Sequence, residues 1–326
     1  MTTEGREVVR VEGLVKDFRP GLGIRAKRVL DGITFSVQEN EIFGFVGPNG
    51  AGKTTTLKTL MGLIRPTAGS ATILGHDIRE SGFRKHVGFL PEVSYFYDYL
   101  TGIEFLDFYA RLSGLPRAER PDRIATLLGW VGLSHAGDSR LRTYSKGMLQ
   151  RIGIAQALIH DPQVVFLDEP MSGLDPLGRK EIRDLILRLR TDGKTVFMNT
   201  HILSDVEMVC DRVAIIVEGK IRYEGRIEDF IAEDRQQADV VLARVPAELA
   251  TTLEERFDAE LRGHGHQVEA RVPEKRVNDV LRVAIDAGAE VVSVTPVRVS
   301  LESIFLETIE ETTHARDRGA FVEEGF

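Results

Sequence analysis

Short apolar runs along the first part of the chain predict buried β-strands. Two of them, ITFSV at 33–37 and IFGFV at 42–46, flank a turn at 39–40, and four of the five residues in the second run are apolar. Further runs lie at 164–167 and 195–201. Because short, nearly continuous apolar runs are typical of strands covered on both faces, we expect an α/β fold with a largely parallel sheet.

Apolar residues at helical spacing predict two amphipathic helices in the same part of the chain. One begins at Pro176 and ends at Asp192–Gly193. The other is capped by Ser145 and ends before Asp161–Pro162. Their apolar stripes are Ile182, Leu185, Ile186 and Leu189 in the first, and Met148, Ile152, Ala155 and Ile159 in the second.

The pattern changes after a hairpin signal at 213–225. Strands are predicted at 238–245, 266–272 and 290–294, and helices at 247–257, 274–288 and 300–309. This alternation predicts a small α+β domain over 226–310, between a larger first domain at 1–225 and a mobile tail at 311–326. His264 and His266 lie in GHGHQ, which we interpret as a turn and not as a metal site, because no cysteine or acidic pattern accompanies them.

Composition narrows the classes of function. The formal net charge of −8 and the pI near 5.6 argue against a general nucleic-acid binder, which needs a basic surplus. A single cysteine, Cys210, excludes an internal disulfide and fits a reducing compartment. The N-terminal residues have no signal-peptide core, and no apolar run approaches the ~18 residues that span a bilayer. If the protein works at a membrane, another chain must supply the crossing.

A phosphate-binding loop follows the strand at 42–46. The segment GPNGAGKTTTL at 47–57 fits the pattern G-x-x-x-x-G-K-[ST], between a strand and a helix. Glycines let backbone amides turn towards phosphate, Lys53 reaches the terminal phosphates and the Thr54 hydroxyl ligates magnesium. The alternative is a glycine-rich turn that matches by chance. The predicted nucleotide-binding residues are Gly47, Asn49, Gly50, Ala51, Gly52, Lys53, Thr54 and Thr55.

Two acids and a histidine follow the next strands. The run at 164–167 delivers Asp168 and Glu169 to the carboxyl edge of the sheet, where ligands of α/β sheets collect. Asp168 is predicted to hold magnesium and Glu169 to polarise the attacking water. His201 ends the neighbouring strand, where a γ-phosphate could be sensed. The alternatives are two solvated acids and a packed or surface histidine.

The order of these motifs identifies a family. GPNGAGKT, then YSKGM with Gln150–Arg151, then FLDEP, SGLDP and a strand ending in His201 resemble the nucleotide-binding subunit of an ATP-binding cassette (ABC) transporter over about residues 8–225. The LPE sequence and the C-terminal extension are similar to those of bacterial ABC-2 type exporters. The resemblance implies a P-loop ABC ATPase domain, with a mixed sheet and a helical subdomain at about 93–160, that hydrolyses ATP with Mg²⁺.

The resemblance also gives roles to residues that the first motifs do not explain. Ser145 and Gly147 cap a helix, and in the family this turn meets the γ-phosphate bound by the opposite subunit. The family's Leu-Ser-Gly-Gly-Gln is Tyr-Ser-Lys-Gly-Met here, so Lys146 adds positive charge. Asp175 is expected to face the partner subunit. Glu92 stands where the family carries a glutamine that contacts magnesium and the permease.

Adenine recognition is expected from an aromatic residue near the N-terminus. Phe18 is the nearest match to the family position, and its ring supplies the surface that stacking needs. An inserted segment, GLGIRAKRVL at 21–30, follows it and leaves a core phenylalanine as the alternative. We interpret the basic residues Arg25, Lys27 and Arg28 in this segment as a solvated loop, with contact to a membrane surface as the alternative.

A helical arm at 93–142 is the expected contact with a membrane partner. Thr101 and Glu104 fit a capping box that starts a helix. Four aromatic residues precede it on a loop, and four so close together are hard to bury at once, so we favour a groove that receives a helix of the permease over a core cluster. The four are Tyr95, Phe96, Tyr97 and Tyr99, and the helix adds Ile103, Phe105, Leu106, Phe108 and Tyr109.

The predicted function is therefore the ATPase subunit of a bacterial exporter with a separate transmembrane permease. Two copies are expected to dimerise on ATP, at the cytoplasmic face of the membrane and without nucleic acid. The alternative is a non-transport ABC ATPase acting in DNA repair or on ribosomes. It is disfavoured because the arm lacks a heptad coiled coil and GPNGAGKT occurs once. A regulatory nucleotide sensor is a third reading, which Glu169 disfavours.

Overall fold

The computed structural model describes residues 6–19, 26–93, 95–230, 237–257, 259–264 and 267–297. The chain divides into two compact units, Met1–Arg226 and Ile227–Phe326. The first unit contains β1 (Glu7–Phe18), β2 (Lys27–Gln38), β3 (Ile42–Val46), α1 (Lys53–Leu60), β4 (Ala68–Ile73), β5 (His76–Asp77), β6 (Val87–Leu90), α2 (Gly102–Leu112), α3 (Arg120–Trp130), α4 (Lys146–Ala157), β7 (Val164–Asp168), α5 (Pro176–Thr191), β8 (Thr195–Thr200), α6 (Leu203–Val209), β9 (Arg212–Val217) and β10 (Lys220–Arg226).

A six-stranded mixed sheet forms the centre of the first unit, in the order β10-β9-β3-β8-β7-β6. The strands from β9 to β6 run parallel, and β10 pairs antiparallel with β9. Every residue of β3, β7 and β8 is buried, as their apolar runs predict. The parallel arrangement brings the carboxyl ends of β3, β7 and β8 to one edge of the sheet.

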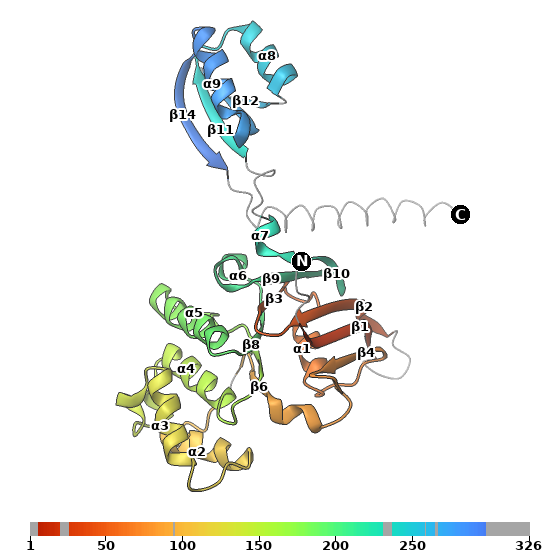
Figure 1. The fold of residues 1–326 in the computed structure, drawn as a ribbon, viewed down its shortest axis with the longest axis vertical. Helices are drawn as coiled ribbons and strands as arrows, with labels where there is room; N and C mark the ends of the chain where they lie inside the picture. The colour runs from red at the N-terminus through yellow and green to blue at the C-terminus, as the bar shows by residue number, and fades with distance from the viewer. Residues whose placement is uncertain are drawn as a thin grey trace, which may run out of the picture. The chain divides into compact units, whose positions relative to one another are not determined.

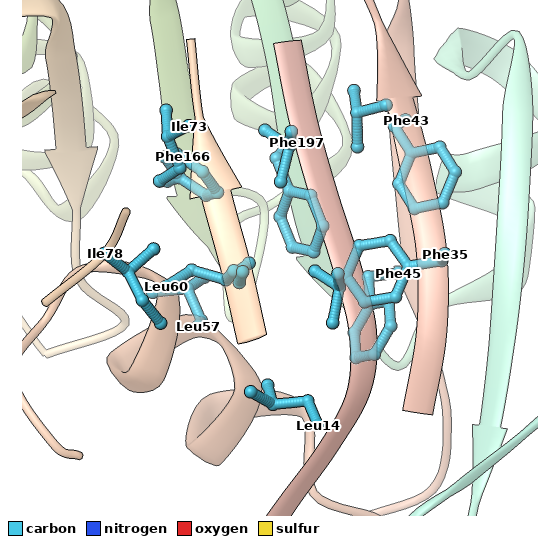
Figure 2. Close-up of a cluster of buried hydrophobic side chains, with 14 of the residues drawn as sticks. Leu14, Phe35, Phe43, Phe45, Leu57, Leu60, Ile73, Ile78, Phe166 and Phe197 are labelled. Carbon is cyan, nitrogen blue, oxygen red and sulfur yellow. The ribbon is translucent and has the colours of Figure 1, made fainter. Parts of the chain in front are cut away.

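A second, antiparallel sheet of β2, β1, β4 and β5 packs over α1. The core between the two sheets is rich in phenylalanine: the rings of Phe35 and Phe45 lie 5.2 Å apart, and Phe197 lies 5.5 Å from Phe45 and 5.2 Å from Phe166 (Figure 2). This packing fixes β3, β7 and β8 against one another. The ends of these strands are therefore held on a rigid support.

The helices α2, α3 and α4 group together on the side of the six-stranded sheet opposite β1, β2 and β4 (Figure 1). The predicted capping box starts α2, where Thr101 N donates to Glu104 Oε2 at 2.8 Å and Glu104 N donates to Thr101 Oγ1 at 3.2 Å. The predicted helices after Ser145 and Asp175 are confirmed as α4 and α5. A polar contact joins this group to α5: Trp130 Nε1, at the end of α3, donates to Asp192 Oδ2 at 3.0 Å.

The inserted segment differs from the expected solvated loop. Lys27 and Arg28 belong to β2, and Arg28 pairs with Asp17 at 2.9 Å and with Asp31 at 3.0 Å. The strand extends because the cross-strand ion pair between Arg28 and Asp17 joins its beginning to β1. Arg25 lies outside the described residues.

The second unit contains α7 (Ile227–Phe230), β11 (Gln237–Ala243), α8 (Ala247–Phe257), β12 (Glu260–His264), β13 (Gln267–Pro273), α9 (Val277–Asp286) and β14 (Glu290–Val297). Its four strands form an antiparallel sheet in the order β12-β13-β11-β14. The β-α-β-β-α-β order is the split βαβ arrangement. Buried residues of β11, β13, α8 and α9 form its own core.

The α+β class expected for this part is confirmed, with two differences in detail. β12 has no counterpart among the predicted strands, and His264 ends it rather than lying in the turn. His266, the predicted helix at 300–309 and the tail at 311–326 lie outside the described residues. None of the described helices is both long enough and apolar enough to span a bilayer.

Candidate functional site

The phosphate-loop residues connect β3 to α1. Gly50 and Gly52 have positive φ angles of 83° and 112°, and Gly52 precedes the first turn of α1 without a side-chain cap. Amides in the first turn of a helix have no partner within the helix, so those at the start of α1 are available to an anion. Asn49 and Gly50 are exposed, Thr54 and Thr55 are half-buried and Ala51 is buried.

Close packing requires glycine at two positions of this loop. A Cβ atom on Gly47 would lie 2.2 Å from the carbonyl oxygen of Ile216, and one on Gly52 would lie 2.7 Å from Leu30 Cδ2 and 3.0 Å from Val29 O. The loop therefore presses against β9 and β2, and a side chain at either position would displace it. Its shape is set before a ligand arrives.

Lys53 lies under the loop and is 7% exposed. Its ammonium Nζ donates to Gly47 O at 2.7 Å and to Pro48 O at 3.3 Å. Burial lowers the pKa of Lys53, and the charges of Glu169, Asp168 and Glu92 oppose that effect. The lysine thus lies between the backbone of the loop and a group of three acids.

Asp168 ends β7 and is 3% exposed. Asn199, on the neighbouring strand β8, donates from Nδ2 to Asp168 Oδ1 at 2.5 Å. Burial raises the pKa of Asp168 to about 6 and the charges of Glu92 and Glu169 add to the rise, while the bond from Asn199 opposes it. The charge of Lys53 also opposes the rise, and a further cation close to this buried carboxylate would stabilise its ionised form.

Glu169 has the unusual backbone φ of 50° and is almost fully buried. Its Oε1 lies 2.8 Å from His201 Nδ1, and its Oε2 accepts from Thr200 Oγ1 at 3.3 Å. Its backbone N donates to Asn199 O at 2.8 Å. Strained backbone at the end of a buried strand occurs where the surroundings determine the conformation, and here three contacts with β8 and its end do so.

Glu92, between β6 and α2, is exposed. Its charge raises the pKa of Asp168 and opposes the fall in the pKa of Lys53, so it shares the electrostatic environment of both. Oxygen ligands of this kind suit Mg²⁺, which proteins usually bind through one or two carboxylates together with substrate phosphates. Thr54, Asp168 and Glu92 therefore fit a magnesium ion that a bound nucleotide would share.

Ser145 and Gly147 lie at the start of α4, outside this group. Ser145 is exposed and its Oγ accepts from Met148 N at 3.3 Å, which makes it the N-cap. A Cβ atom on Gly147 would meet nothing within 4 Å, so the surface above this turn is open. An exposed helix start with open space in front of it can receive an anion from outside the chain.

Asp175 is the N-cap of α5, and its Oδ1 accepts from Gly178 N at 3.0 Å. Its turn approaches the Ser145 turn, because a Cβ atom on Gly173 would lie 2.1 Å from Lys146 Nζ. Asp175 and Ser145 are both exposed. The two turns consequently form one polar surface of the first unit.

Phe18, at the end of β1, is 41% exposed, and Lys16 Nζ lies 5.0 Å from the centre of its ring. The ring is therefore accessible and is not a core phenylalanine. In the arm, Tyr95, Tyr97 and Tyr99 are exposed, whereas Phe96 packs against Phe105 with ring centres 5.5 Å apart.

Asn199 and Thr200 are site residues that sequence reasoning missed. Both lie in the run at 195–201, where they are the last polar positions before His201. Their contacts with Asp168 and Glu169 arise only because β8 pairs with β7, 31 residues away along the chain. In the sequence, these two residues could have been found only as polar residues at the end of a run that predicts a buried strand.

Known proteins are similar to this chain in sequence. A family model described as "ABC transporter" matches residues 30–172. An uncharacterised ABC transporter ATP-binding protein of Synechocystis sp. is 42% identical over 307 residues, covering 93% of this chain and 85% of the relative. The fluoroquinolones export ATP-binding protein of Mycobacterium tuberculosis is 40% identical over 239 residues, covering 72% of this chain and 77% of the relative.

A solved structure shares the fold of the first unit. It is a dimeric ATP-binding cassette in a post-hydrolysis state, bound to ADP and phosphate, with a TM-score of 0.61 and 24% identity. The match covers 67% of this chain and 98% of that chain. The mixed sheet with a helical subdomain is therefore the fold of an ATP-binding cassette.

Proposed function

This chain belongs to the ATP-binding subunits of ABC transporters, which hydrolyse ATP to drive transport, and we propose that two copies of it enclose two ATP molecules and power export through a separate permease. We assign the cassette to residues 1–225. The observation that carries the proposal is the group formed by Lys53, Asp168, Glu169 and His201 around the carboxyl ends of β3, β7 and β8. The non-transport alternative is not favoured, because the relatives are named as transporter subunits.

ATP binds through the loop and first turn at 47–55. The amides at the start of α1 bind the phosphates, and Lys53 exchanges its bonds to Gly47 O and Pro48 O for the terminal phosphates. The accessible ring of Phe18 stacks on the adenine, once Lys16 moves from one of its faces. Thr54, Asp168 and Glu92 would hold Mg²⁺, which would neutralise charge on the phosphates.

Hydrolysis of ATP depends on Glu169 and His201. Glu169 orients and polarises the attacking water, since its carboxylate is held by His201 and Thr200 at the end of β7. His201 keeps the carboxylate in place and contacts the γ-phosphate. Positioning and charge stabilisation supply most of the catalysis in phosphoryl transfer, and the buried surroundings strengthen both.

The second copy completes each site. Ser145, Gly147 and the start of α4 bind the γ-phosphate held by the opposite chain, and Asp175 contacts that chain. The exposure of both turns and the open space above Gly147 support this arrangement. The related solved cassette is dimeric with ADP and phosphate. Lys146 adds positive charge beside the phosphate.

The permease is the second partner. Tyr95, Tyr97 and Tyr99, with Phe108 packed on Tyr97 at 5.5 Å, offer exposed aromatic surface to a helix of the permease. This contact holds the chain at the cytoplasmic face of the membrane. Export as the direction is supported by the Mycobacterium tuberculosis relative, which is named for export of fluoroquinolones.

Phosphate release from ATP by the purified full-length chain tests the proposal. We expect Mg²⁺-dependent turnover by the unaltered protein and loss of turnover in Glu169→Gln. Turnover that persists at the same rate in Glu169→Gln would contradict the assigned role of Glu169, and absence of turnover in the unaltered protein, with and without its permease, would contradict the proposed function.

A further inference from the structure

A small cavity of about 170 Å³ lies between α5 and α6. Arg179, Lys180 and Arg183 of α5 line one side, and Ser204 and Asp205 of α6 line the other. No residue assigned to nucleotide binding or catalysis lines it. The two helices around the cavity nevertheless each begin close to a residue of the proposed site.

Two oppositely charged side chains that line this cavity, Asp205 and Arg179, each have a buried atom without a hydrogen-bond partner in the part of the chain that the structure describes. Asp205 is 3% exposed, and within the described residues its Oδ2 has no hydrogen-bond partner. The same holds for the buried Nε of Arg179. Burial raises the pKa of Asp205, and the charges of Arg179 and Arg183 oppose the rise. An unpaired buried carboxylate is unfavourable, so both groups gain if they meet.

The cavity explains how two such groups can remain apart. Its volume leaves room for a few water molecules, which can bridge buried polar groups. Arg183 is not equally available, because its Nη1 contacts Met208 Sδ at 3.2 Å and its Nε lies 3.8 Å from Asp184. Of the two arginines that line the cavity, Arg179 is thus the one with a buried nitrogen that has no hydrogen-bond partner among the described residues.

The position of the two helices gives this pair a function. α6 begins at Leu203, two residues after His201, and α5 begins at Pro176, directly after Asp175. His201 touches Glu169 at 2.8 Å. α6 therefore follows His201, which lies beside the chain's own hydrolytic centre. α5 follows the turn of Asp175, which faces the partner in the proposed dimer.

We propose that Asp205 is a positioning residue that forms an ion pair with Arg179 when α5 and α6 move together and close this cavity. The ion pair couples the position of His201 to that of Asp175. The inference rests on the proposed dimer. A carboxylate and a guanidinium form strong, directional hydrogen bonds, which would lock α5 against α6. The pair makes hydrolysis in one site depend on contact with the second copy.

The test compares steady-state ATP hydrolysis of full-length variants with their melting temperature without nucleotide. Asp205→Asn and Arg179→Gln should each lower kcat by about 10-fold and change KM for ATP less than about twofold, since the pair forms after binding. The double variant should be no slower than the slower single variant. Asp205→Glu should stay within about threefold of the unaltered protein, because the cavity accommodates one more methylene and the charge is kept.

The melting temperature distinguishes a positioning role of Asp205 from a role in stabilising the fold. Asp205→Asn removes an unpaired buried charge from the open protein, so its melting temperature without nucleotide should stay the same or rise. Asp184→Asn changes an exposed carboxylate on α5, the helix of Arg179; it is the control and should leave kcat and melting temperature unchanged.

Three results would overturn the inference: an unchanged kcat in Asp205→Asn, losses that add in the double variant, or a melting temperature that falls together with kcat in both single variants. Each of these results is compatible with the proposed function if the unaltered protein hydrolyses ATP and dimerises when ATP binds. If the unaltered protein does neither, the proposed function itself is wrong and the inference falls with it.

Discussion

His201 Nδ1 lies 2.8 Å from Glu169 Oε1, although the two residues are 32 positions apart along the chain. The contact exists because β7 and β8 are neighbours in the parallel sheet, so their carboxyl ends bring the two side chains together. Thr200 Oγ1 donates to the other carboxylate oxygen of Glu169. The orientation of Glu169 is therefore set by the last residue of β8 and by His201, which follows it.

Replacement of His201 by alanine should slow ATP hydrolysis by at least about 100-fold with little change in ATP binding, since correct placement of a catalytic group contributes on this scale. Phosphate release and nucleotide affinity, measured on the same sample, give the two quantities. His135→Ala, an exposed histidine in the arm, is the matched control. Hydrolysis at the unaltered rate would contradict the role of His201.

Replacement of Lys53 by alanine should weaken ATP binding by about 100-fold or more, because the terminal phosphates lose their charged hydrogen-bond donor. Lys58→Ala lies on the same helix but is exposed, and it should bind as the unaltered protein does. Isothermal titration with ATP and Mg²⁺ measures both. Equal affinities of the two variants would count against the assigned phosphate site.

The raised pKa of Asp168 predicts a pH dependence of stability. The folded protein holds the carboxyl proton up to a pKa of about 6, whereas an unfolded aspartate releases it near 3.8. Between these values the folded state binds more protons, so the contribution of Asp168 to stability is greatest at low pH and is lost as pH rises through about 6. Asp168→Asn lacks this loss and should gain about 3 kcal/mol relative to the unaltered protein between pH 3.5 and 7.

Urea unfolding of both proteins in EDTA, at several pH values, measures this difference. A difference in unfolding free energy that does not change with pH would mean that Asp168 is ionised in the folded protein throughout the range. Mg²⁺ should reverse part of the loss near pH 7, because a bound cation stabilises the ionised carboxylate.

Local pattern predicts the parts of this site that depend on neighbours in sequence. The phosphate loop, the strand ends near Asp168 and His201, the cap at Ser145 and the helix start at Pro176 all follow from short motifs or periodicity, because strand, turn and helix start are local structures. Asn199 could not be predicted in this way. Its contact with Asp168 depends on which strands are neighbours, and the sheet order is set by packing across the whole core.

The start of β2 also could not be predicted from the local sequence. The segment at 21–30 reads as a polar insertion, yet its second half is the start of β2, held by Arg28 to Asp17 and Asp31. Charged residues are poor indicators of strands, because β-propensity reflects the neighbours across the strand. β12 is short and rich in charge, with Gly263 inside it, and it was missed for the same reason.

Replacement of Tyr97 by alanine should uncouple ATP hydrolysis from transport. Tyr97 is exposed and its ring packs on Tyr99 and Phe108 of the arm, so its removal takes away surface offered to the permease at little expected cost to the fold. In vesicles that contain the permease, cargo moved per phosphate released should fall. Leu63→Ala, an exposed apolar residue outside the arm, is the control. An unchanged ratio in Tyr97→Ala would refute the docking surface.

The most direct test of the central claim is the size of the purified Glu169→Gln protein with and without ATP and Mg²⁺. Glutamine keeps the shape of the side chain but removes the charge that polarises water, so ATP should stay bound and the closed dimer should accumulate. We predict a dimer that requires ATP, and a monomer when Ser145→Arg is added, because the larger side chain obstructs the helix start that meets the opposite phosphate. A monomer under all conditions, or a dimer that forms equally well with Ser145→Arg, would contradict the claim that each copy completes the nucleotide site of the other.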